Sequence, residues 1–576
     1  MQFLSKISPH KYILAILALA FVLRFVGIWY GLPSLYNSDE PTNVSEALSF
    51  GAKKSLEPGF LQYPSLYFYF LFLIYGFYFA IGFVVGIFSS ILDFGASFFL
   101  DPTGLFLVGR FLSVVLGTFS VWVIFRLGQR FFSKNVALIS SLILALSFIH
   151  ISRSHWVLIE AGLGLICAWA LYLILKYYEK PTIKANVFAS LVCGLAISTK
   201  YNAGFIFIPL LLSSILAYKK DFAKLFKNLG LSVVTLVSGF LLGSPYWIFS
   251  FSSFFDSTFK YTFSHVTYGQ IGHITAIPFL WPFWELVSND WTIGFLLIAG
   301  FVYVLFAKEK KQILLVSFAV PTFLYVGTWS HADVHYLIPI FPALVILAAV
   351  FLNDILRHIR NRNLKILFAI FLFILPFTKI LYYDFGLTQK DTRAFAEDWF
   401  ESNVPEGSVI GYENYVYGPN LFDPSRFFKN EAQSRFLPLE LRERLVEESL
   451  RRKTYNLFNF RKDVKRVGFS KNVRFKNSYF RELLLNRLPK LSTLKKQGVK
   501  YIIASSDTYD HYFKKRPPKK GTPVWLSFQN GRAFYQSVFT SRELVLLKEF
   551  QPEFPNLGPT IKIYKFKPIG NGSSNQ

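Results

Sequence analysis

Hydrophobic stretches of about 18 or more residues without a charged side chain recur along the first 384 residues of this 576-residue chain. A helix needs about 20 apolar residues to cross a bilayer, and its backbone hydrogen bonds are then satisfied internally. These stretches therefore predict a polytopic α-helical membrane protein. Because the first stretch, Tyr12 to Tyr30, is long and many others follow it, we expect a retained span and not a cleaved signal peptide.

Clusters of basic residues account for much of the formal net charge of +26 and predict the topology. They alternate with loops poorer in Lys and Arg, which is typical of cytoplasmic loops alternating with outer ones, and this pattern excludes nucleic-acid binding as the reason for the charge. The clusters lie near positions 126–134, 176–184, 219–227, 308–311 and 357–365. The outer loops are expected at 31–62, 150–156, 200–202, 250–290 and 328–335.

The number of crossings depends on Tyr63 to Leu100, which is long enough for two spans but contains Asp93 and several glycines. The loops before and after this region are already assigned to a side of the membrane, so the region contributes either no crossing or two crossings. This gives about 11 or 13 transmembrane helices. The other spans are predicted near 12–30, 105–127, 135–150, 157–175, 186–199, 203–218, 229–249, 291–307, 312–328, 334–352 and 366–383.

The composition changes near Asp384, which divides the chain into a membrane domain, 1–384, and a water-soluble C-terminal domain, 385–576. Short β-type stretches at 408–412 and 499–504 and a helical pattern at 391–400 predict an α/β fold on the outer side for the second domain. Its last residues, Gly570 to Gln576, are predicted to be a disordered tail.

Two adjacent carboxylates, Asp39 and Glu40, follow the first span and form the first candidate site. Acidic groups at the mouth of a membrane bundle need water, a polar cavity or a partner charge, so they mark functional positions. The alternative is structural: Asp39 as the N-cap of a helix, with Glu40 in its first turn and Pro41 behind it. The two roles are compatible, since a short helix would hold the carboxylate rigidly.

An ordered set of short motifs resembles the family of protein O-mannosyltransferases and bacterial aminoarabinose lipid A transferases over most of residues 12 to 352. The motifs, in chain order, are Asp39-Glu40, Tyr63-Pro64-Ser65-Leu66, Val108-Gly109-Arg110-Phe111, Ser152-Arg153-Ser154-His155 with Glu160, Ser198-Thr199-Lys200-Tyr201, Gly243-Ser244-Pro245-Tyr246 and His335-Tyr336-Leu337-Ile338-Pro339. The set indicates the class of enzyme but no particular substrate.

The resemblance implies a membrane glycosyltransferase of the GT-C fold that moves a sugar from a polyprenyl-phosphate carrier to a protein, lipid or glycan acceptor on the extracytoplasmic side. It implies a multi-pass protein of the cell inner (plasma) membrane, with the lipid-linked sugar and the bilayer as partners and no nucleic acid. Within it, Asp39, with Glu40 beside it, is expected to act as general base on the acceptor hydroxyl.

The resemblance also assigns the donor phosphate to Lys200, Arg110 and Arg153. Each has a structural alternative: a snorkelling interfacial lysine for Lys200, an interfacial anchor for Arg110, and for Arg153 an ion pair with Glu160 on one helical face. The supporting residues expected around them are Tyr63, His155, Glu160, Tyr201, His335 and Tyr336.

His335 stands where many members of the family have an arginine, which puts direct phosphate binding there in doubt. Together with His331 and Asp333 it resembles a metal cluster, but no further ligands match in the sequence. We therefore predict no metal site from the residues, and the need for a divalent ion stays open.

Two other classes of protein are compatible with a polytopic bundle that contains charged residues. A lipid or glycan transporter or flippase typically shows internal duplication and broken helices near the middle of the membrane. This chain shows no visible repeat, and its polar candidates lie at the outer ends of spans. A non-catalytic anchor for the C-terminal domain gives no reason for the ordered polar motifs.

Overall fold

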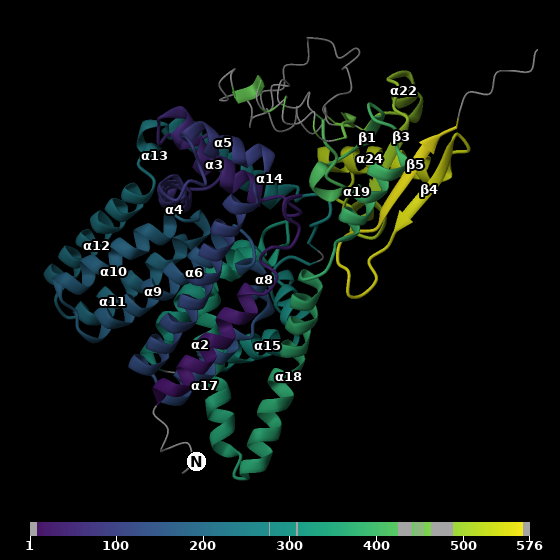
Figure 1. The fold of residues 1–576 in the computed structure, drawn as a ribbon. Helices are drawn as coiled ribbons and strands as arrows, with labels where there is room; N and C mark the ends of the chain where they lie inside the picture. The colour runs from purple at the N-terminus through teal and green to yellow at the C-terminus, as the bar shows by residue number, and fades with distance from the viewer. Residues whose placement is uncertain are drawn as a thin grey trace, which may run out of the picture.

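A bundle of long helices and a smaller domain built on a β-sheet make up the molecule (Figure 1). The computed structural model describes residues 9–423, 441–461 and 488–567, apart from positions 276, 307, 308, 444, 446, 448–450 and 452. The predicted disordered tail lies outside the described residues.

The bundle contains the predicted spans, each of which overlaps a helix. These helices are α2 (Pro9–Phe25), α6 (Thr103–Phe131), α7 (Lys134–Ala145), α8 (Phe148–Ser154), α9 (Ile159–Glu179), α10 (Ile183–Ile197), η1 (Tyr201–Ile206), α11 (Phe207–Tyr218), α12 (Phe222–Gly243), α15 (Trp281–Leu305), α16 (Lys310–Gly327), η2 (Val334–Ile340), α17 (Phe341–His358) and α18 (Arg362–Leu387). α17 lies at the centre of the bundle, since all its residues from Phe341 to Ala349 are buried.

In the described part of the chain, eight helices are long and apolar enough to cross a membrane, or nine if α7 and α8, bent by 56°, form one span. This number is below the predicted 11 to 13. α2 and α10 have only 17 and 15 residues, and α16 begins with two lysines that lower its mean hydropathy. All three still pack as helices of the bundle.

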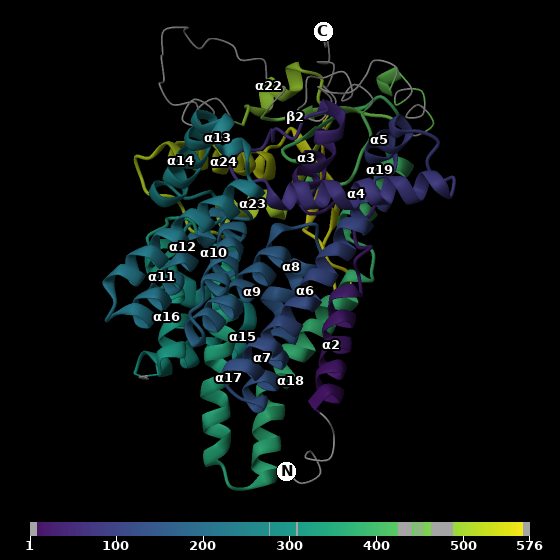
Figure 2. The same ribbon diagram turned by 90° about the vertical axis from the view of Figure 1, so that its left-hand side faces the viewer.

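The ambiguous region between residues 63 and 100 forms α4 (Leu66–Val84) and α5 (Ile91–Leu100). Figure 2 shows α4 lying crosswise to α2 and α6 at the end of the bundle nearest the sheet domain. One face of α4 is apolar and exposed, including Phe77 and Ile81 at 60% and 63%. α4 is one of the eight helices that could cross a membrane by length and composition, but this orientation favours the alternative in which the region lies at the membrane surface and does not cross.

Short connections at the two ends of the bundle agree with the predicted alternation of loops. At the end far from the sheet, Lys311 and Arg130 both contact Glu179, and Tyr218 donates a hydrogen bond to the Pro181 carbonyl. These contacts bring four of the basic clusters to one end, and the α17–α18 turn lies there too (Figure 2). At the other end, the predicted outer loops meet around α3 (Glu40–Lys53), α13 (Tyr246–Phe249) and α14 (Phe251–Thr267).

The C-terminal domain is a five-stranded sheet in the order β2-β1-β3-β5-β4, with β1 parallel to β2 and β3 and the other pairs antiparallel. Its strands are β1 (Val409–Tyr412), β2 (Asn456–Asn459), β3 (Tyr501–Ser505), β4 (Leu544–Phe550) and β5 (Ile561–Phe566). Its helices are α19 (Thr392–Asn403), η3 (Tyr415–Tyr417), α22 (Leu491–Lys496), α23 (Ser506–Phe513) and α24 (Pro523–Thr540). The two predicted strands and the predicted helix are present, and the expected α/β fold is confirmed.

Alternate residues of the central strand β3 point to opposite faces of the sheet, as the pleat requires. Ile502 packs toward α23 and α24, whereas Ile503 packs toward α19. The domain is joined to the first outer loop by buried polar contacts: Tyr30 donates a hydrogen bond to Asp391, and the Arg393 guanidinium lies 3.8 Å from the Tyr36 ring centroid. These contacts hold the sheet domain over the end of the bundle opposite the basic clusters.

Candidate active site

A polar cavity of about 520 Å³ lies at the end of the bundle opposite the basic clusters, beneath the C-terminal domain. Loops from distant parts of the chain build its walls, and most of the predicted site residues take part. Its charged and ionisable lining residues are Asp39, Arg153, Glu160, His265, His273, His331, Asp333 and His335, with Tyr36, Tyr63, Tyr336 and Tyr417 among the others.

Asp39 occupies the N-cap position of α3, but its side chain makes no capping hydrogen bond. The helix starts where the sequence predicted, with Pro41 in its first turn. The carboxylate is exposed in the wall of the cavity, and its one described hydrogen bond is a 3.4 Å contact from the Ser38 hydroxyl. An acceptor group in the cavity can therefore reach it, which a carboxylate committed to capping would not allow.

Glu40, by contrast, is fully buried in an ion pair with Arg110. Its two oxygens accept hydrogen bonds of 2.8 and 2.7 Å from the guanidinium and one of 2.7 Å from the Val157 backbone. Arg110 also donates to the carbonyls of Ile28 and Tyr30. Neither residue lines this polar cavity or the more apolar one beside it, and their contacts are those of a buried structural pair, which does not favour the predicted catalytic role of Glu40 or the phosphate-binding role of Arg110.

Arg153 and Glu160 do not pair with each other, contrary to the helical spacing of seven residues. The helix is interrupted between Ser154, the last residue of α8, and Ile159, the first residue of α9, so the two side chains belong to different helices. Arg153 contacts Asp333 at 3.1 Å, and Glu160 accepts a hydrogen bond of 2.9 Å from Lys200. Arg153, Asp333 and Glu160 line the polar cavity.

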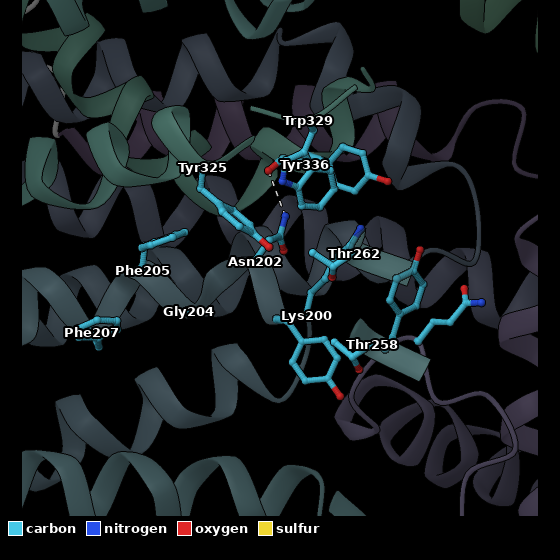
Figure 3. Close-up of a pocket in the computed structure, with 13 residues that line it drawn as sticks. Lys200, Asn202, Gly204, Phe205, Phe207, Thr258, Thr262, Tyr325, Trp329 and Tyr336 are labelled. Atoms are coloured by element: carbon cyan, nitrogen blue, oxygen red, sulfur yellow. Dashed lines mark hydrogen bonds between the residues drawn. The ribbon is translucent and has the colours of Figure 1, made fainter. Parts of the chain in front are cut away.

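A second, more apolar cavity of about 270 Å³ has Lys200 in its wall (Figure 3). Tyr325, Trp329 and Tyr336 gather around it, and Phe205 and Phe207 lie toward one side. The Asn202 side chain donates a 3.1 Å hydrogen bond to the Tyr336 carbonyl. Tyr201, predicted as a supporting residue, also lines this cavity, as do Gln62, Tyr63, Gly204, Thr258 and Thr262.

The two cavities adjoin, because Gln62, Tyr63 and Tyr336 line both. The Lys200–Glu160 pair lies at their boundary, with the lysine lining the apolar cavity and the glutamate the polar one. Lys200 is only 4% exposed, and its ammonium lies 5.1 and 5.6 Å from the ring centroids of Tyr63 and Tyr336. A snorkelling lysine would extend toward the aqueous surface, so the burial of Lys200 argues against that alternative.

Histidines gather on one side of the polar cavity. His335 Nδ1 lies 2.9 Å from the Asp333 carboxylate, and the centroid of its ring lies 4.0 Å from that of Tyr336. His335 is therefore held beside this carboxylate. Burial raises the pKa of Asp333, but His335 and Arg153 outweigh this effect and hold the pKa well below its ordinary value. Burial and the neighbouring histidines lower the pKa of His331 to about 2, so its imidazole is neutral at pH 7.

His155 is buried away from both cavities, and its ring nitrogens contact the carbonyls of Ile151 and Val26. These contacts position α8 against the first predicted span and do not favour the supporting role predicted for His155. Arg24, which was not predicted to have a role, is fully buried among the carbonyls of Ala20, Leu144 and Ala145. A charge inside a predicted span is the signal that could have found it.

The C-terminal domain contributes to the cavity as well. Tyr417, at the end of the short η3 helix after β1, lines the cavity that Asp39 borders. His511 of α23 lies with its ring centroid 6.2 Å from that of His273. Tyr417 and His511 lie far along the chain from the membrane spans, so no sequence pattern predicted that either would lie near the cavity.

Comparison with known proteins gives two kinds of match. Residues 88–249 match the sequence model of the family described as dolichyl-phosphate-mannose-protein mannosyltransferase. A curated, uncharacterized protein of Aquifex aeolicus is 28% identical over 290 residues, covering 48% of this chain and 55% of that protein. The match thus spans about half the length of this relative.

Solved structures are similar at low sequence identity. ArnT from Cupriavidus metallidurans bound to undecaprenyl phosphate has a TM-score of 0.47 and 12% identity, with 96% of this chain and 98% of that chain covered. The Archaeoglobus fulgidus oligosaccharyltransferase has a TM-score of 0.48 and 13% identity, with 89% and 71% covered. The match to the family confirms the resemblance predicted from the ordered motifs: this chain is similar to the dolichyl-phosphate-mannose-protein mannosyltransferases.

Proposed function

We propose that this chain is a membrane glycosyltransferase that transfers a sugar from a polyprenyl-phosphate carrier to an acceptor on the extracytoplasmic side. The observation that carries the proposal is the pair of adjoining cavities, one polar and bordered by Asp39, the other apolar and bordered by Lys200. A lipid-linked sugar phosphate combines the same three chemistries in one molecule: an apolar chain, an anionic phosphate and a polar sugar.

The apolar cavity suits the start of the polyprenyl chain. Phe207, which lines it, is 39% exposed on the outside of the bundle, so the cavity reaches a surface that faces lipid. A donor can therefore enter from the bilayer with its tail still in the membrane. Lys200 at the boundary offers a compact positive charge to the phosphate, and Glu160 keeps that ammonium in position while the site is empty.

Asp39 takes the role of general base in the polar cavity. The acceptor hydroxyl gives its proton to the carboxylate as its oxygen bonds to the anomeric carbon, and the bond from that carbon to the phosphate oxygen breaks. The polyprenyl phosphate leaves as a stable anion without needing an acid. The phosphate gains negative charge in this step, so Lys200 stabilises the leaving group more than the substrate.

The sidedness of the reaction follows from the charge of the loops. The basic clusters meet at the end of the bundle opposite Asp39, and such clusters remain in the cytoplasm. The cavities and the C-terminal domain would then face outward from the inner (plasma) membrane.

The test compares Asp39→Asn with Glu57→Gln, a control at an exposed carboxylate of the same outer loop that lines neither cavity. Purified variants in lipid nanodiscs receive radiolabelled undecaprenyl- and dolichyl-phosphate sugars, together with extracts containing acceptors. Asp39→Asn should lower release of free polyprenyl phosphate by about 100-fold or more, because general-base catalysis contributes about 10²–10⁴-fold. The control should retain its activity.

Near-normal transfer by Asp39→Asn would remove Asp39 from the chemistry. A transporter or flippase, the alternative class, would move labelled carrier between leaflets with its sugar still attached. Movement of intact donor without any release of polyprenyl phosphate would therefore replace the glycosyltransferase proposal by that alternative.

A further inference from the structure

Two outer loops bring a carboxylate and two imidazoles together on one side of the polar cavity. His273, His331 and Asp333 each offer a ligand atom, and these atoms lie within 4.8 Å of one another. The loops are joined by an isolated β-bridge between Ile274 and His331, and the Ala332 backbone N–H donates a 2.8 Å hydrogen bond to the His273 carbonyl. Backbone contacts therefore hold the three groups in register.

The two oxygens of the Asp333 carboxylate have different neighbours, and only Oδ2 faces His273. Its Oδ1 contacts Arg153 at 3.1 Å, His335 Nδ1 at 2.9 Å and the His335 backbone N–H at 3.1 Å. Its Oδ2 lies 4.0 Å from His273 Nδ1. Partners that fix one oxygen of a ligating carboxylate from outside are typical of metal sites, where they orient the ligand.

His331 supplies a separate indication that something is bound here. It is 3% exposed, and its Nδ1 has no hydrogen-bond partner among the described residues. A buried polar atom without a partner destabilises a protein by about 1–3 kcal/mol and calls for an explanation. Its ring lies 5.0 Å from that of His273 at 21°, so the two imidazoles lie side by side next to Asp333.

We propose that His273, His331 and Asp333 bind one divalent transition-metal ion of the zinc class. Two imidazoles and one carboxylate match Zn²⁺, whereas Mg²⁺ and Ca²⁺ prefer an all-oxygen shell. Bonds of about 2.0–2.2 Å in a tetrahedral shell place two ligand atoms about 3.3–3.6 Å apart, so the three atoms, now within 4.8 Å of one another, need to approach by up to about 1.5 Å. His273 lies on a partly exposed loop that can provide this movement.

The remaining coordination positions face the polar cavity, whose wall includes Asp39. An ion bound there would accept an oxygen of an anionic or hydroxyl-bearing substrate, a role that rests on the proposed glycosyltransferase function. The positive charges of Arg153, already paired with Asp333, and of Lys515, which acts on His273, oppose cation binding. Binding of the ion would therefore depend on its bonds to the histidine nitrogens and not on the electrostatic potential of the cavity.

The test measures Zn²⁺ binding by the full chain, with no donor or acceptor present, so that its outcome is independent of the proposed function. Protein with its affinity tag removed and stripped by chelator is titrated with Zn²⁺ by calorimetry, and bound metal is counted by mass spectrometry. We expect one equivalent in the parent and a loss of about tenfold or more in affinity in His273→Ala. A matched control, His358→Ala, changes an exposed histidine outside the cavities and should bind as the parent does.

His273 is a loop residue that lies outside the buried core, so its removal should leave the fold intact, and thermal unfolding of the same samples checks this. Absence of stoichiometric Zn²⁺ in the parent, or equal affinity in His273→Ala, would overturn the site. Tighter binding of Mg²⁺ than of Zn²⁺ would overturn the assigned class of metal. Near-normal transfer by Asp39→Asn would contradict the proposed function but would leave the Zn²⁺ titration of the parent unaffected, so the two proposals fail separately.

Discussion

Glu40→Gln tests whether the second of the two adjacent carboxylates holds the fold together while the first does chemistry. In the parent, Glu40 accepts two hydrogen bonds from Arg110 and one from the Val157 backbone, and both charged side chains are fully buried. Glutamine has nearly the same shape but only one oxygen, so its NH₂ group must face a donor. At least one charge-assisted bond is lost, and the guanidinium loses its counter-charge.

The magnitude follows from these contacts. Removing one partner of a buried ion pair destabilises a protein by about 3–5 kcal/mol. Arg110 keeps its hydrogen bonds to the Ile28 and Tyr30 carbonyls and lies 4.7 Å from the Trp156 ring centroid, so it is not left without partners. We therefore expect the lower end of the range, about 3 kcal/mol.

The measurement is thermal unfolding of purified protein in one detergent at a single scan rate, followed by size-exclusion chromatography, because unfolding of large proteins is often irreversible. Asp39→Asn is the matched control at the next residue, with an exposed carboxylate that makes no capping bond, and should change stability by no more than about 0.5 kcal/mol. The double variant Glu40→Leu with Arg110→Met should recover part of the loss, since it removes both buried charges. Equal unfolding temperatures for the parent and Glu40→Gln would refute the structural role of the pair.

Three further predictions concern the donor site, the topology and the packing of the bundle. Lys200→Ala should lower both the apparent affinity for polyprenyl donor and the maximal rate, and Lys200→Arg should recover part of each. Donor kinetics per folded molecule that equal those of the parent would rule out Lys200 as a ligand of the phosphate. A cysteine at the exposed position Glu406 should react with an impermeant thiol reagent in intact spheroplasts, and one at Lys310 should not. The native Cys167 and Cys193 are buried and should give little background, and the reverse labelling pattern would invert the predicted topology. Gly239→Val should lower the unfolding temperature, because even a Cβ on this residue of α12 would lie 2.2 Å from the carbonyl oxygen of Leu191 in α10. An unchanged unfolding temperature would mean that the two helices can move apart without loss of stability.

Several features of the site could be predicted because they are local in the sequence. The helix that begins beside Asp39 and Glu40 follows from capping and proline preferences within a few residues. The placement of Lys200 at the end of a span follows from hydropathy. Asp39 and Lys200 each line a cavity, while their predicted chemical roles stay predictions.

The partners of the charged groups could not be predicted in the same way. Glu40 pairs with Arg110 and Arg153 with Asp333, across 70 and 180 residues of chain. Hydrophobic periodicity indicates that a side chain is buried, but it carries no information about which distant charge lies opposite. Arg153 and Glu160 were paired wrongly because seven residues place two side chains on one face only in an unbroken helix.

The sequence alone determined that the chain is a membrane bundle followed by an α/β domain, because a bilayer accepts only long apolar helices and a sheet needs alternating, β-branched segments. Tertiary structure decided which carboxylate faces the cavity and which is buried, since consecutive residues at a helix start point in different directions. It also decided that His273, isolated in the sequence, meets His331 and Asp333, and that Tyr417 closes the cavity from the other domain. Such groupings depend on how loops from distant spans pack together, which no local pattern specifies.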